Sequence, residues 1–592
     1  MMPSRKVHAR LAAASAIATA FAAPVGLSAP AHAQAVPPPT LGVPTRDELE
    51  GIRNQPPEQP PRLEIEGGIE RAPCPLADPQ FADVPVTISG VTFNNLKGAS
   101  PAELEPAWRP FADKPQPVAV ICEIRDAAAT ILRNKGYLAA VQVPTQRIEN
   151  GQVQLEVLYA RVSAIRARGE TRGAERKLQD YLGQLTQDEI FDRNRAERYL
   201  LLARDLPGYN VQLTLRPAGT APGDLVGEVT VLRRPYALDF TLQNYAAKPT
   251  GRWGGQVRAQ AFGLTGLGDA TSIALYSTVE FEEQQILQVQ HEFRPGSEGL
   301  VIEGQFTYAW TEPDLGPGGP RLEARTLFTG LSARYPLQRS QGANLWVGGG
   351  FDYVDQDVDL LAPDTRLSRD KLRILWLRAD YDAVDLRSRR PRWRAAGTLE
   401  LRRGLDVFDA TDGCGGVACP AGQVAPSRLD GDPEATVIRA SAEGEVALGR
   451  EFALAVAPRG QYAFDPLFSF EEFTAGNYTV GRGFDPGTIL GDSGVGVTVE
   501  LRGPRLKPFD RFEARFQPYL FGDAAWVWND NDGLGSERLT SVGGGVRAEL
   551  GDRFRLDTTL AVPTERAGLQ TKRGDARLLV TLTTRLLPWR NN

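Results

Sequence analysis

Histidine is nearly absent from this chain. Only three histidines occur among 592 residues, and two of them, His8 and His32, lie within the first 33 residues. A metal centre built on several imidazoles would need more of them. The chain also lacks a G-x-x-x-x-G-K-[ST] sequence, so no phosphate-binding loop for ATP is predicted. We therefore predict that the protein is not an enzyme, and we assign no catalytic residue, no cofactor and no metal ligand.

One short stretch suggests a hydrolase all the same. The segment Gly491-Asp492-Ser493-Gly494 has the order of the nucleophile turn of a trypsin-type protease. A Ser-His-Asp hydrolase needs a base beside its serine, and His291 is the one histidine left to supply it. No motif around His291 supports that role. Ser493 is therefore predicted to be a structural residue at the start of a strand.

Long apolar runs are also missing. No window after the N-terminus offers ~18 uninterrupted apolar residues, so a membrane-spanning helix is not expected. A soluble protein or a closed β-barrel remains. The balance of 73 Asp+Glu to 67 Lys+Arg is mildly acidic, which argues against nucleic acid as a partner. Sixty glycines and 44 prolines suit a β-rich chain with many turns.

The first 33 residues have the order of a secretory signal peptide. Basic residues up to Arg10 precede a small apolar segment at 11–23, and Ala31-His32-Ala33 forms an A-x-A cleavage site. The mature chain should therefore begin near Gln34 and work outside the cytoplasm.

Cysteine is scarce too, with four in the whole chain. They fall as two local pairs, Cys74 with Cys122 and Cys414 with Cys419. In an exported protein an even number of cysteines predicts disulfides. A zinc site is the alternative, but Cys414 and Cys419 have C-x4-C spacing in a glycine-rich loop without a nearby histidine.

Residues 34–73 are rich in proline and poor in bulky apolar side chains, so an extended linker is expected there. One segment of it differs. Thr45 followed by Glu48 is a capping-box pattern, which makes residues 45–54 a candidate short helix. A disordered linker with a nascent turn is the alternative interpretation.

Two small α+β modules are predicted in tandem, at 74–162 and 163–234. Each runs in the order strand, helix, helix, strand, strand, with alternating strands and helically spaced apolar residues. In the first module, Ile121, Ala128 and Leu132 fall on or near one helix face. Each module can bury a helix pair against a three-stranded sheet.

Both modules resemble those of a known family. Residues 133–162, RNKGYLAAVQVPTQRIENGQVQLEVLYARV, resemble the first POTRA module of two-partner secretion transporters, and residues 195–217, RAERYLLLARDLPGYNVQLTLRP, resemble the second. These transporters are outer-membrane proteins that export haemolysins and filamentous adhesins. Cys74 and Cys122 fall where many family members have a disulfide in the first module. The resemblance implies a structural motif in the second module, made of Glu197, Arg198, Asp205, Leu206, Pro207 and Gly208.

From residue 235 to residue 592 the pattern changes to strands at regular spacing. Sixteen candidates occur, and an even number suits a single-chain outer-membrane barrel. The predicted fold is a transmembrane β-barrel of 16 antiparallel strands preceded by two α+β POTRA domains. The candidate strands begin near residues 237, 254, 269, 284, 301, 325, 343, 371, 393, 434, 452, 494, 514, 538, 553 and 575.

Alternation within these strands is the main physical evidence for a barrel. In residues 494–502, valines and a leucine take every second position, while Glu500 and Arg502 lie on the other face. A barrel in lipid around a wet lumen requires apolar residues outward and polar residues inward. A soluble β-sandwich has the same period and buries its apolar face against a second sheet. The signal peptide and the number of strands favour the barrel.

A long loop at about 464–493 separates two of the candidate strands. It resembles the family's large loop, which folds into the lumen and carries a V-R-G-[YF] sequence at its tip. The matching residues here are Val480, Gly481, Arg482, Gly483 and Phe484. Gly481 is an extra residue between the valine and the arginine of this motif.

The family pattern also includes F-x-D-x-G on a later strand, which corresponds here to Phe521–Ala525, with alanine in place of the last glycine. Period two places Phe521 and Asp523 on one face and Trp526 on the other. Because the tryptophan face must meet lipid or its interface, Asp523 should point into the lumen. The resemblance implies an ion pair with Arg482, whose planar guanidinium can hold a carboxylate bidentately. An ordinary solvated loop arginine is the alternative.

The resemblance implies an outer-membrane pore in a Gram-negative cell, monomeric and with its POTRA domains in the periplasm. These domains would recruit an unfolded β-helical partner of the haemolysin or adhesin type, which the pore exports. Residues 45–54 are the candidate for the helix that plugs the resting pore. A barrel-assembly insertase shares the fold and the loop motif, but two modules and the D-L-P-G segment favour secretion. A soluble β-rich surface or binding protein is a third hypothesis.

Overall fold

The computed structural model describes residues 43–53, 73–220, 223–388, 390–415, 418–508, 513–530, 535–568 and 570–587. The predicted signal peptide, residues 1–33, lies outside these ranges, as does most of the proline-rich segment 34–73. Within the described ranges, no helix combines the length and the apolar character needed to cross a membrane.

The first module is a three-stranded sheet packed against two helices. Its elements are η2 (Pro75–Ala77), η3 (Pro79–Phe81), β1 (Pro85–Thr87), β2 (Gly90–Asn94), α3 (Pro101–Trp108), η4 (Arg109–Phe111), β3 (Pro115–Pro117), α4 (Val120–Asn134), β4 (Ala139–Gln142) and β5 (Gln152–Tyr159). The sheet order is β2-β5-β4, with β2 parallel and β4 antiparallel to the central strand. Helix α4 buries Ile121, Ile124 and Leu132 in the module's core. The apolar spacing noted in the sequence is thus the buried face of this helix.

The second module repeats this plan with a core of its own. Its elements are β6 (Arg161–Gly169), α5 (Glu175–Gly183), η5 (Gln184–Thr186), α6 (Arg193–Arg204), β7 (Tyr209–Pro217) and β8 (Asp224–Arg233). The sheet order is β6-β8-β7. Helix α6 is capped by Asp192, whose side chain accepts hydrogen bonds from the backbone N–H groups of Asn194 and Arg195. Tyr181 and Leu200 of the two helices pack with the sheet residues in one buried cluster.

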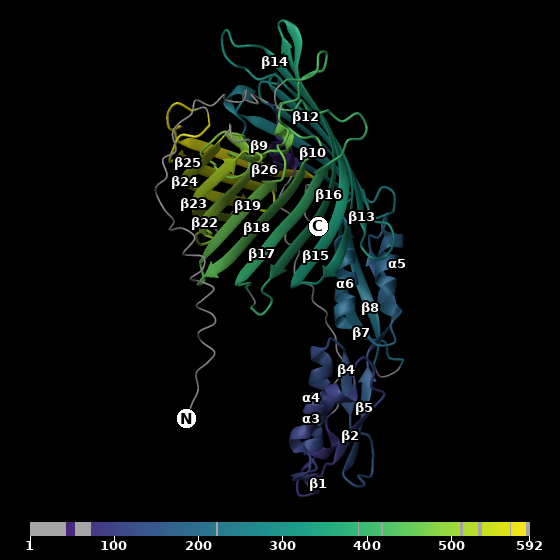
Figure 1. Ribbon diagram of the computed structural model, residues 1–592. Helices are drawn as coiled ribbons and strands as arrows, with labels where there is room; N and C mark the ends of the chain where they lie inside the picture. The colour runs from purple at the N-terminus through teal and green to yellow at the C-terminus, as the bar shows by residue number, and fades with distance from the viewer. Residues whose placement is uncertain are drawn as a thin grey trace. The chain divides into compact units, whose positions relative to one another are not determined.

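Strands from Tyr236 onward form a closed barrel (Figure 1). Its strands are β9 (Tyr236–Gln243), β10 (Gly254–Phe262), β11 (Ala270–Thr278), β12 (Gln284–Phe293), β13 (Val301–Thr311), β14 (Leu322–Arg339), β15 (Ala343–Leu361), β16 (Asp364–Val384), β17 (Trp393–Gly404), β18 (Thr436–Leu448), β19 (Phe452–Ala463), β22 (Ser493–Arg502), β23 (Ala514–Trp528), β24 (Ser536–Leu550), β25 (Phe554–Pro563) and β26 (Arg577–Leu587). Each strand pairs antiparallel with its neighbours, and β26 pairs with β9 to close the barrel. The predicted sixteen-stranded antiparallel barrel is confirmed.

The two faces of the barrel wall differ as the alternation predicts. On β23, Tyr519, Phe521 and Asp523 are buried on the inside, whereas Leu520 is 63% exposed and Trp526 is also exposed on the outside. The outward face of the other strands carries further exposed large apolar side chains, Ile273, Leu331, Leu377, Leu399, Leu560 and Leu578 among them. This outer apolar surface is what a lipid environment requires.

One strand begins earlier than the sequence predicts. The eighth strand was expected near residue 371, but β16 starts at Asp364 and runs for 21 residues, on the order of 70 Å at ~3.4 Å per residue. The tip of the β15–β16 hairpin extends beyond β17, whose pairing with β16 ends at Ile374, whereas β14 pairs with β15 almost to its end (Figure 1). Residues 364–371 hold five charged side chains in DTRLSRDK. This end lacks the apolar alternation that marks strands in lipid, and so the sequence pattern missed it.

The segment between β19 and β22 contains η7 (Ser469–Glu471), β20 (Phe473–Ala475) and β21 (Ile489–Gly491). Strands β20 and β21 pair with each other. Most of its residues are buried, and they contact inward-facing residues of the wall. We call residues 464–492 the lumen loop. Helix α2 (Arg46–Arg53) also contacts the inside of the barrel.

Candidate functional site

The tip of the lumen loop carries the predicted motif and lies against the inner wall. Val480 and Phe484 are buried in a cluster with Ala525 of β23 and Leu539 of β24. Gly481, the extra glycine of the motif, has φ +119°, and a Cβ there would come within 2.6 Å of Leu539 Cδ1. The backbone angle at this position favours glycine, and a Cβ here would displace the Leu539 side chain.

Arg482 and Asp523 form a bidentate ion pair inside the barrel. The Arg482 Nη2 and Nε groups donate to the two Asp523 oxygens at 2.9 and 3.1 Å. The backbone N–H of Arg482 donates to the same carboxylate at 3.0 Å, and the hydroxyls of Thr498 and Ser541 add two more hydrogen bonds. The guanidinium also stacks over the Phe521 ring, with 3.5 Å from Cζ to the ring centroid. Asp523 is thus fully hydrogen-bonded in a buried position, which is the condition for keeping a charge there.

Glu500 of β22 extends this network along the wall. It accepts hydrogen bonds from Arg547 at 2.6 and 2.9 Å and from Arg502 at 2.7 Å, and Arg482 Nη1 lies 3.4 Å away. Arg547 also pairs with Asp557 of β25. The sequence pattern placed Glu500 and Arg502 on the inward face of β22 but gave no sign of Arg547 or Arg482, because these come from another strand and from the lumen loop.

Helix α2 occupies the lumen through one apolar and several charged contacts. Leu49 is 6% exposed, and its backbone oxygen accepts a hydrogen bond from Gln288 at 3.1 Å. The lumen is therefore not lined by polar residues alone. Leu49 packs in an apolar cluster of wall and loop residues, Tyr276, Ile286, Ala309, Val354, Leu372, Ile374, Phe468 and Phe470.

The charges of α2 pair with both the wall and the lumen loop. Asp47 accepts hydrogen bonds from Arg459 of β19 at 3.0 and 3.2 Å and from the Thr474 hydroxyl of β20. Arg46 lies 3.4 Å from Glu400 of β17 and 3.8 Å from Glu471 of the lumen loop. An eight-residue helix is too short to be stable alone, so these contacts account for its order.

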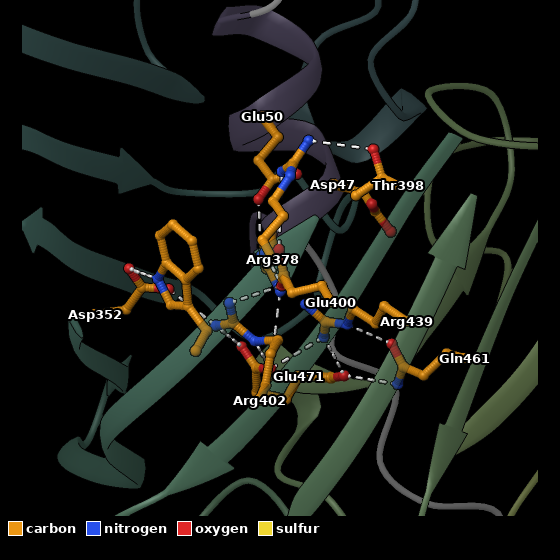
Figure 2. Close-up of polar contacts among 12 residues, drawn as sticks. Asp47, Glu50, Asp352, Arg378, Thr398, Glu400, Arg402, Arg439, Gln461 and Glu471 are labelled. Carbon is orange, nitrogen blue, oxygen red and sulfur yellow. Dashed lines mark hydrogen bonds and ion pairs between the residues drawn. The ribbon is translucent and has the colours of Figure 1, made fainter. Parts of the chain in front are cut away.

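A buried arginine of the wall joins these elements (Figure 2). Arg402 donates to Glu471 at 2.9 and 3.1 Å, to Asp352 at 2.9 Å and to Glu400 at 3.1 Å. Arg439 also donates to Glu471, at 3.0 Å. Glu471 is thus held by two wall arginines at the point where α2 reaches it. This cluster has no sequence motif, and its members are separated by up to 119 residues.

Glu48 of α2 has a pKa that burial shifts upward. Its carboxylate accepts a hydrogen bond from the Thr45 backbone at 2.8 Å, and its backbone N–H donates to the Thr45 hydroxyl at 3.2 Å, which completes the capping box. Burial raises the pKa of Glu48 to about 7, with smaller raising effects from Asp47 and Asp485 and opposing ones from the Thr45 hydrogen bonds.

The Gly491–Gly494 stretch is an anchor for the lumen loop. Asp492 accepts hydrogen bonds from Arg428 and from the backbone of Leu467 at 2.8 Å and Asp530 at 3.0 Å. Arg428 comes from the extracellular loop between β17 and β18 and also donates to Glu472 at 2.9 Å. One arginine therefore contacts the lumen loop at two separate points, Glu472 and Asp492. Sequence reasoning missed this role.

The serine and the histidine of the protease hypothesis have separate structural partners. The Ser493 hydroxyl, at the start of β22, accepts a hydrogen bond from the Ala463 backbone at 3.0 Å. His291 lies on β12 and contacts Thr271 on β11 at 2.9 Å through Nδ1. The structure does not bring the two residues together.

The predicted motif of the second module meets the turns of the barrel. Asp205 accepts two hydrogen bonds from Arg339 at 2.7 and 2.8 Å. Glu197 accepts one from the backbone of Gln341 at 2.6 Å, and Arg198 donates to the Pro336 oxygen at 2.9 Å.

The D-L-P-G part of the motif forms the turn before β7. Leu206 is buried in the module's core, and Pro207 follows it in the turn. Gly208 has φ +77°, and a Cβ there would lie 2.6 Å from the Arg234 oxygen and from Phe262 of β10. Glycine is required at this position because the backbone angle is left-handed and because a Cβ would collide with a backbone oxygen.

Both disulfides are present. Cys74–Cys122 joins the residue before η2 to helix α4 within the first module, with 6.0 Å between Cα atoms. Cys414–Cys419 closes a short turn in the loop between β17 and β18, with 4.6 Å between Cα atoms. Neither pair is a zinc site.

Comparison with family models gives two matches. A model described as haemolysin secretion/activation protein ShlB/FhaC/HecB matches residues 229–548. A model described as POTRA domain, ShlB-type, matches residues 86–159, within the first module.

Individual proteins and solved structures also resemble this chain. The chain is 22% identical over 536 residues to the heme/hemopexin transporter protein HuxB of Haemophilus influenzae (strain 86-028NP), with 87% of this chain and 90% of that protein covered. Among solved structures, CdiB from Escherichia coli has a TM-score of 0.70 at 16% identity, with 91% of this chain and 96% of that chain covered. CdiB from Acinetobacter baumannii has a TM-score of 0.63 at 17% identity, with 91% and 97% covered. At sequence identities this low, the likeness to the two solved structures shows that this chain shares their fold.

Proposed function

The chain belongs to the haemolysin secretion/activation protein family ShlB/FhaC/HecB, and we propose that it exports a large β-helical partner of the haemolysin or adhesin type. The family makes it an outer-membrane two-partner secretion translocator whose POTRA domains lie in the periplasm and recognise a secreted client. The nature of that client is our proposal.

The closed barrel with α2 in its lumen is the observation that carries the proposal. A client cannot pass while Leu49 fills the apolar cluster and Asp47 and Arg46 bind the wall and the loop. The barrel closes through strand pairing that does not include α2, so α2 can leave without unfolding it. We propose that α2 is the resting plug and that its departure opens the pore.

The lumen loop must also be positioned for export. We propose that the Arg482–Asp523 pair holds its tip in the secretion-competent position. The proposal is supported by the bidentate geometry and by the hydrogen bonds from Thr498 and Ser541 that complete the coordination of Asp523. A solvated loop arginine would show neither its stacking on Phe521 nor its close contact with Asp523.

Client recruitment is proposed to use the edges of the module sheets. The order β2-β5-β4 leaves β2 and β4 at the edges of the first sheet, and the order β6-β8-β7 leaves β6 and β7 at those of the second. An extended, unfolded chain can add a strand to such an edge through backbone hydrogen bonds. Folding outside the cell would then draw the client through the pore.

The pore is proposed to work as a monomer, because sixteen strands of a single chain close the barrel. The alternative within this fold is an insertase that places other barrels in the membrane. The family match over the barrel and the ShlB-type module favour secretion. A soluble surface protein is excluded by the family.

A secretion assay separates the two functions. The probe is the product of a neighbouring gene, if one encodes a large protein with a β-helical repeat, expressed with and without this chain in a Gram-negative host. Secretion predicts that the probe reaches the medium only when this chain is present, while the amounts of other outer-membrane barrels stay unchanged. Loss of those barrels on depletion of this chain, with no effect on the probe, would instead support the insertase.

A further inference from the structure

The loop between β17 and β18 begins on the outside of the barrel. The Leu405 N–H donates to the Arg373 oxygen at 2.8 Å, and the Thr411 N–H donates to the Lys371 oxygen at 3.0 Å, so residues 405–411 run along the free edge of β16. Two side chains on the outward face of β16 then hold the segment. Arg373 Nε donates to the Phe408 oxygen at 3.1 Å, and Lys371 pairs with Asp409.

The position of Phe408 marks the extracellular rim of the outer apolar surface. Its ring contacts that of Phe351 with 6.1 Å between centroids and 75° between planes. Phe351 lies in register between Leu331 and Leu375, two exposed outward leucines. The next outward positions toward the cell exterior are Tyr353, Asp355 and Asp357 on β15 and Arg373, Lys371 and Arg369 on β16.

Above this rim the outward face changes from apolar to charged. Asp355 pairs with Arg373 at 2.8 Å, and Asp357 pairs with Arg369 at 2.7 Å. Charged side chains of this kind mark the end of the hydrocarbon region, because placing them in it is costly. Phe408 contacts the last apolar residue below this boundary.

Phe408 and its neighbour present an unusual apolar surface for a loop. Phe408 is 71% exposed and Val407 is also exposed. Phe408 and Asp409 have φ of 51° and 59°, a conformation that is unfavourable for two successive residues other than glycine. The bonds from Arg373 and Lys371 hold the backbone of this segment against β16.

We propose that Val407 and Phe408 insert into the outer leaflet of the outer membrane and anchor this loop to it. The occupant of their surface is lipid acyl chain, because the surface is continuous with the outward leucines through Phe351 and ends where the charges begin. Aromatic side chains are favoured at this depth. The anchor holds one end of the disulfide-bearing loop at the outer rim, while Arg428 near its other end contacts Asp492 of the lumen loop.

Site-directed spin labelling tests the anchor in the full chain. All four native cysteines are in disulfides. The nitroxide label therefore attaches only at a cysteine introduced by mutation. Phe408→Cys and Val407→Cys are labelled separately, the second with the Phe408 ring intact, and reconstituted into phosphatidylcholine/phosphatidylglycerol vesicles. Collisions with oxygen, which is enriched in lipid, are compared with collisions with nickel-EDDA, which stays in water.

Two exposed leucines of β16 supply the controls. Leu377 is 62% exposed on the apolar surface and Leu367 is 43% exposed near the extracellular tip of the strand. The proposal predicts an oxygen-to-nickel ratio at 407 and 408 close to that of Leu377→Cys and several-fold above that of Leu367→Cys. Retention of the heat-modifiable mobility of folded barrels confirms that each variant has folded.

Two other outcomes would overturn the proposal. A ratio equal to that of Leu367→Cys at both positions would place the loop in water. Weak collisions with both reagents would mean that protein, in these vesicles a second copy of this chain, covers the site. Because neither outcome affects export, failure of the anchor is distinguishable from failure of the proposed function.

Discussion

The Arg482 guanidinium donates to both oxygens of Asp523, and its own backbone N–H donates to one of them. The loop tip is therefore attached to the wall through side chain and backbone together. Removal of the arginine side chain leaves the carboxylate buried with fewer donors, which costs more than the loss of an exposed ion pair.

A double-mutant cycle measures this coupling. Arg482→Gln and Asp523→Asn are each expected to reduce export and to lower the thermal stability of the barrel. The loss in the double variant should be smaller than the sum of the losses in the two single variants. The difference corresponds to a coupling free energy of about 0.5–3 kcal/mol. Export of the client and thermal unfolding are the two measurements.

The exposed pair Arg538–Glu565, at 3.0 Å, is the matched control. Exposed pairs contribute little, so the same cycle with Arg538→Gln and Glu565→Gln should give additive effects. Fully additive losses at Arg482 and Asp523 would contradict a coupled role for that pair.

Leu49→Ala should weaken the plug. Replacing a buried leucine by alanine costs about 2–5 kcal/mol when the cavity does not collapse, and only the plugged state contains this contact. We therefore expect the open state to become at least about tenfold more populated. Single-channel conductance in planar bilayers measures it. Leu337→Ala, at an exposed leucine of β14, should leave the conductance unchanged, and equal effects of both variants would exclude Leu49 as a plug contact.

Plugging should depend on pH through Glu48. In the lumen, the pKa of Glu48 is raised from 4.5 to about 7. When α2 leaves the lumen, the pKa of Glu48 returns to its ordinary value. Between pH 4.5 and about 7 the plugged state therefore binds more protons than the unplugged state. The stabilisation of the plugged state is thus fully present below pH 4.5 and is lost as the pH rises to about 7. Channel opening should increase over that interval and level off above it.

Glu48→Gln is the control, because glutamine can keep the capping box without titrating. Channels of this variant should open to the same extent at every pH between 4.5 and about 7. Glu472 must be considered too, since burial raises its pKa to about 7 against the opposing effect of Arg428. If Glu48→Gln keeps the full pH dependence, the dependence belongs to Glu472 or to another group.

The two disulfides should differ in their effect on stability. Cys74–Cys122 spans 48 residues and Cys414–Cys419 spans five. The chain-entropy model gives about 4 kcal/mol for the longer loop and about 2 kcal/mol for the shorter one. Calorimetry of the double-serine variants should show a lowered transition of the first module for Cys74 and Cys122, with the barrel transition unchanged. A larger loss for Cys414 and Cys419 would contradict this order.

The strands of the barrel were accessible from sequence because their signal is local. Each strand in lipid must alternate, so the period of two shows both the strand and its faces, and it placed Asp523 inside and Trp526 outside. The same reasoning failed at Asp364, where the strand leaves the apolar surface and its charged residues have no reason to alternate.

The contacts that hold α2 and the lumen loop could not be predicted in the same way. Arg402 and Glu471 are adjacent only because β17 and the loop meet in space, and their sequence neighbourhoods contain nothing unusual. Arg428 and Asp492 are a second example. The apolar lumen cluster around Leu49 also went unrecognised, because an inward-facing Val354 is visible only once the register of β15 is known.

The most direct test of the account is translocation by the purified chain. Vesicles containing only this protein are mixed with the urea-denatured β-helical probe, diluted into buffer, and then treated with protease. The account predicts probe that is protected inside the vesicles, in amounts that increase with Leu49→Ala. No protected probe beyond that in protein-free vesicles, with a barrel shown to be folded, would contradict the claim that this chain is a secretion pore.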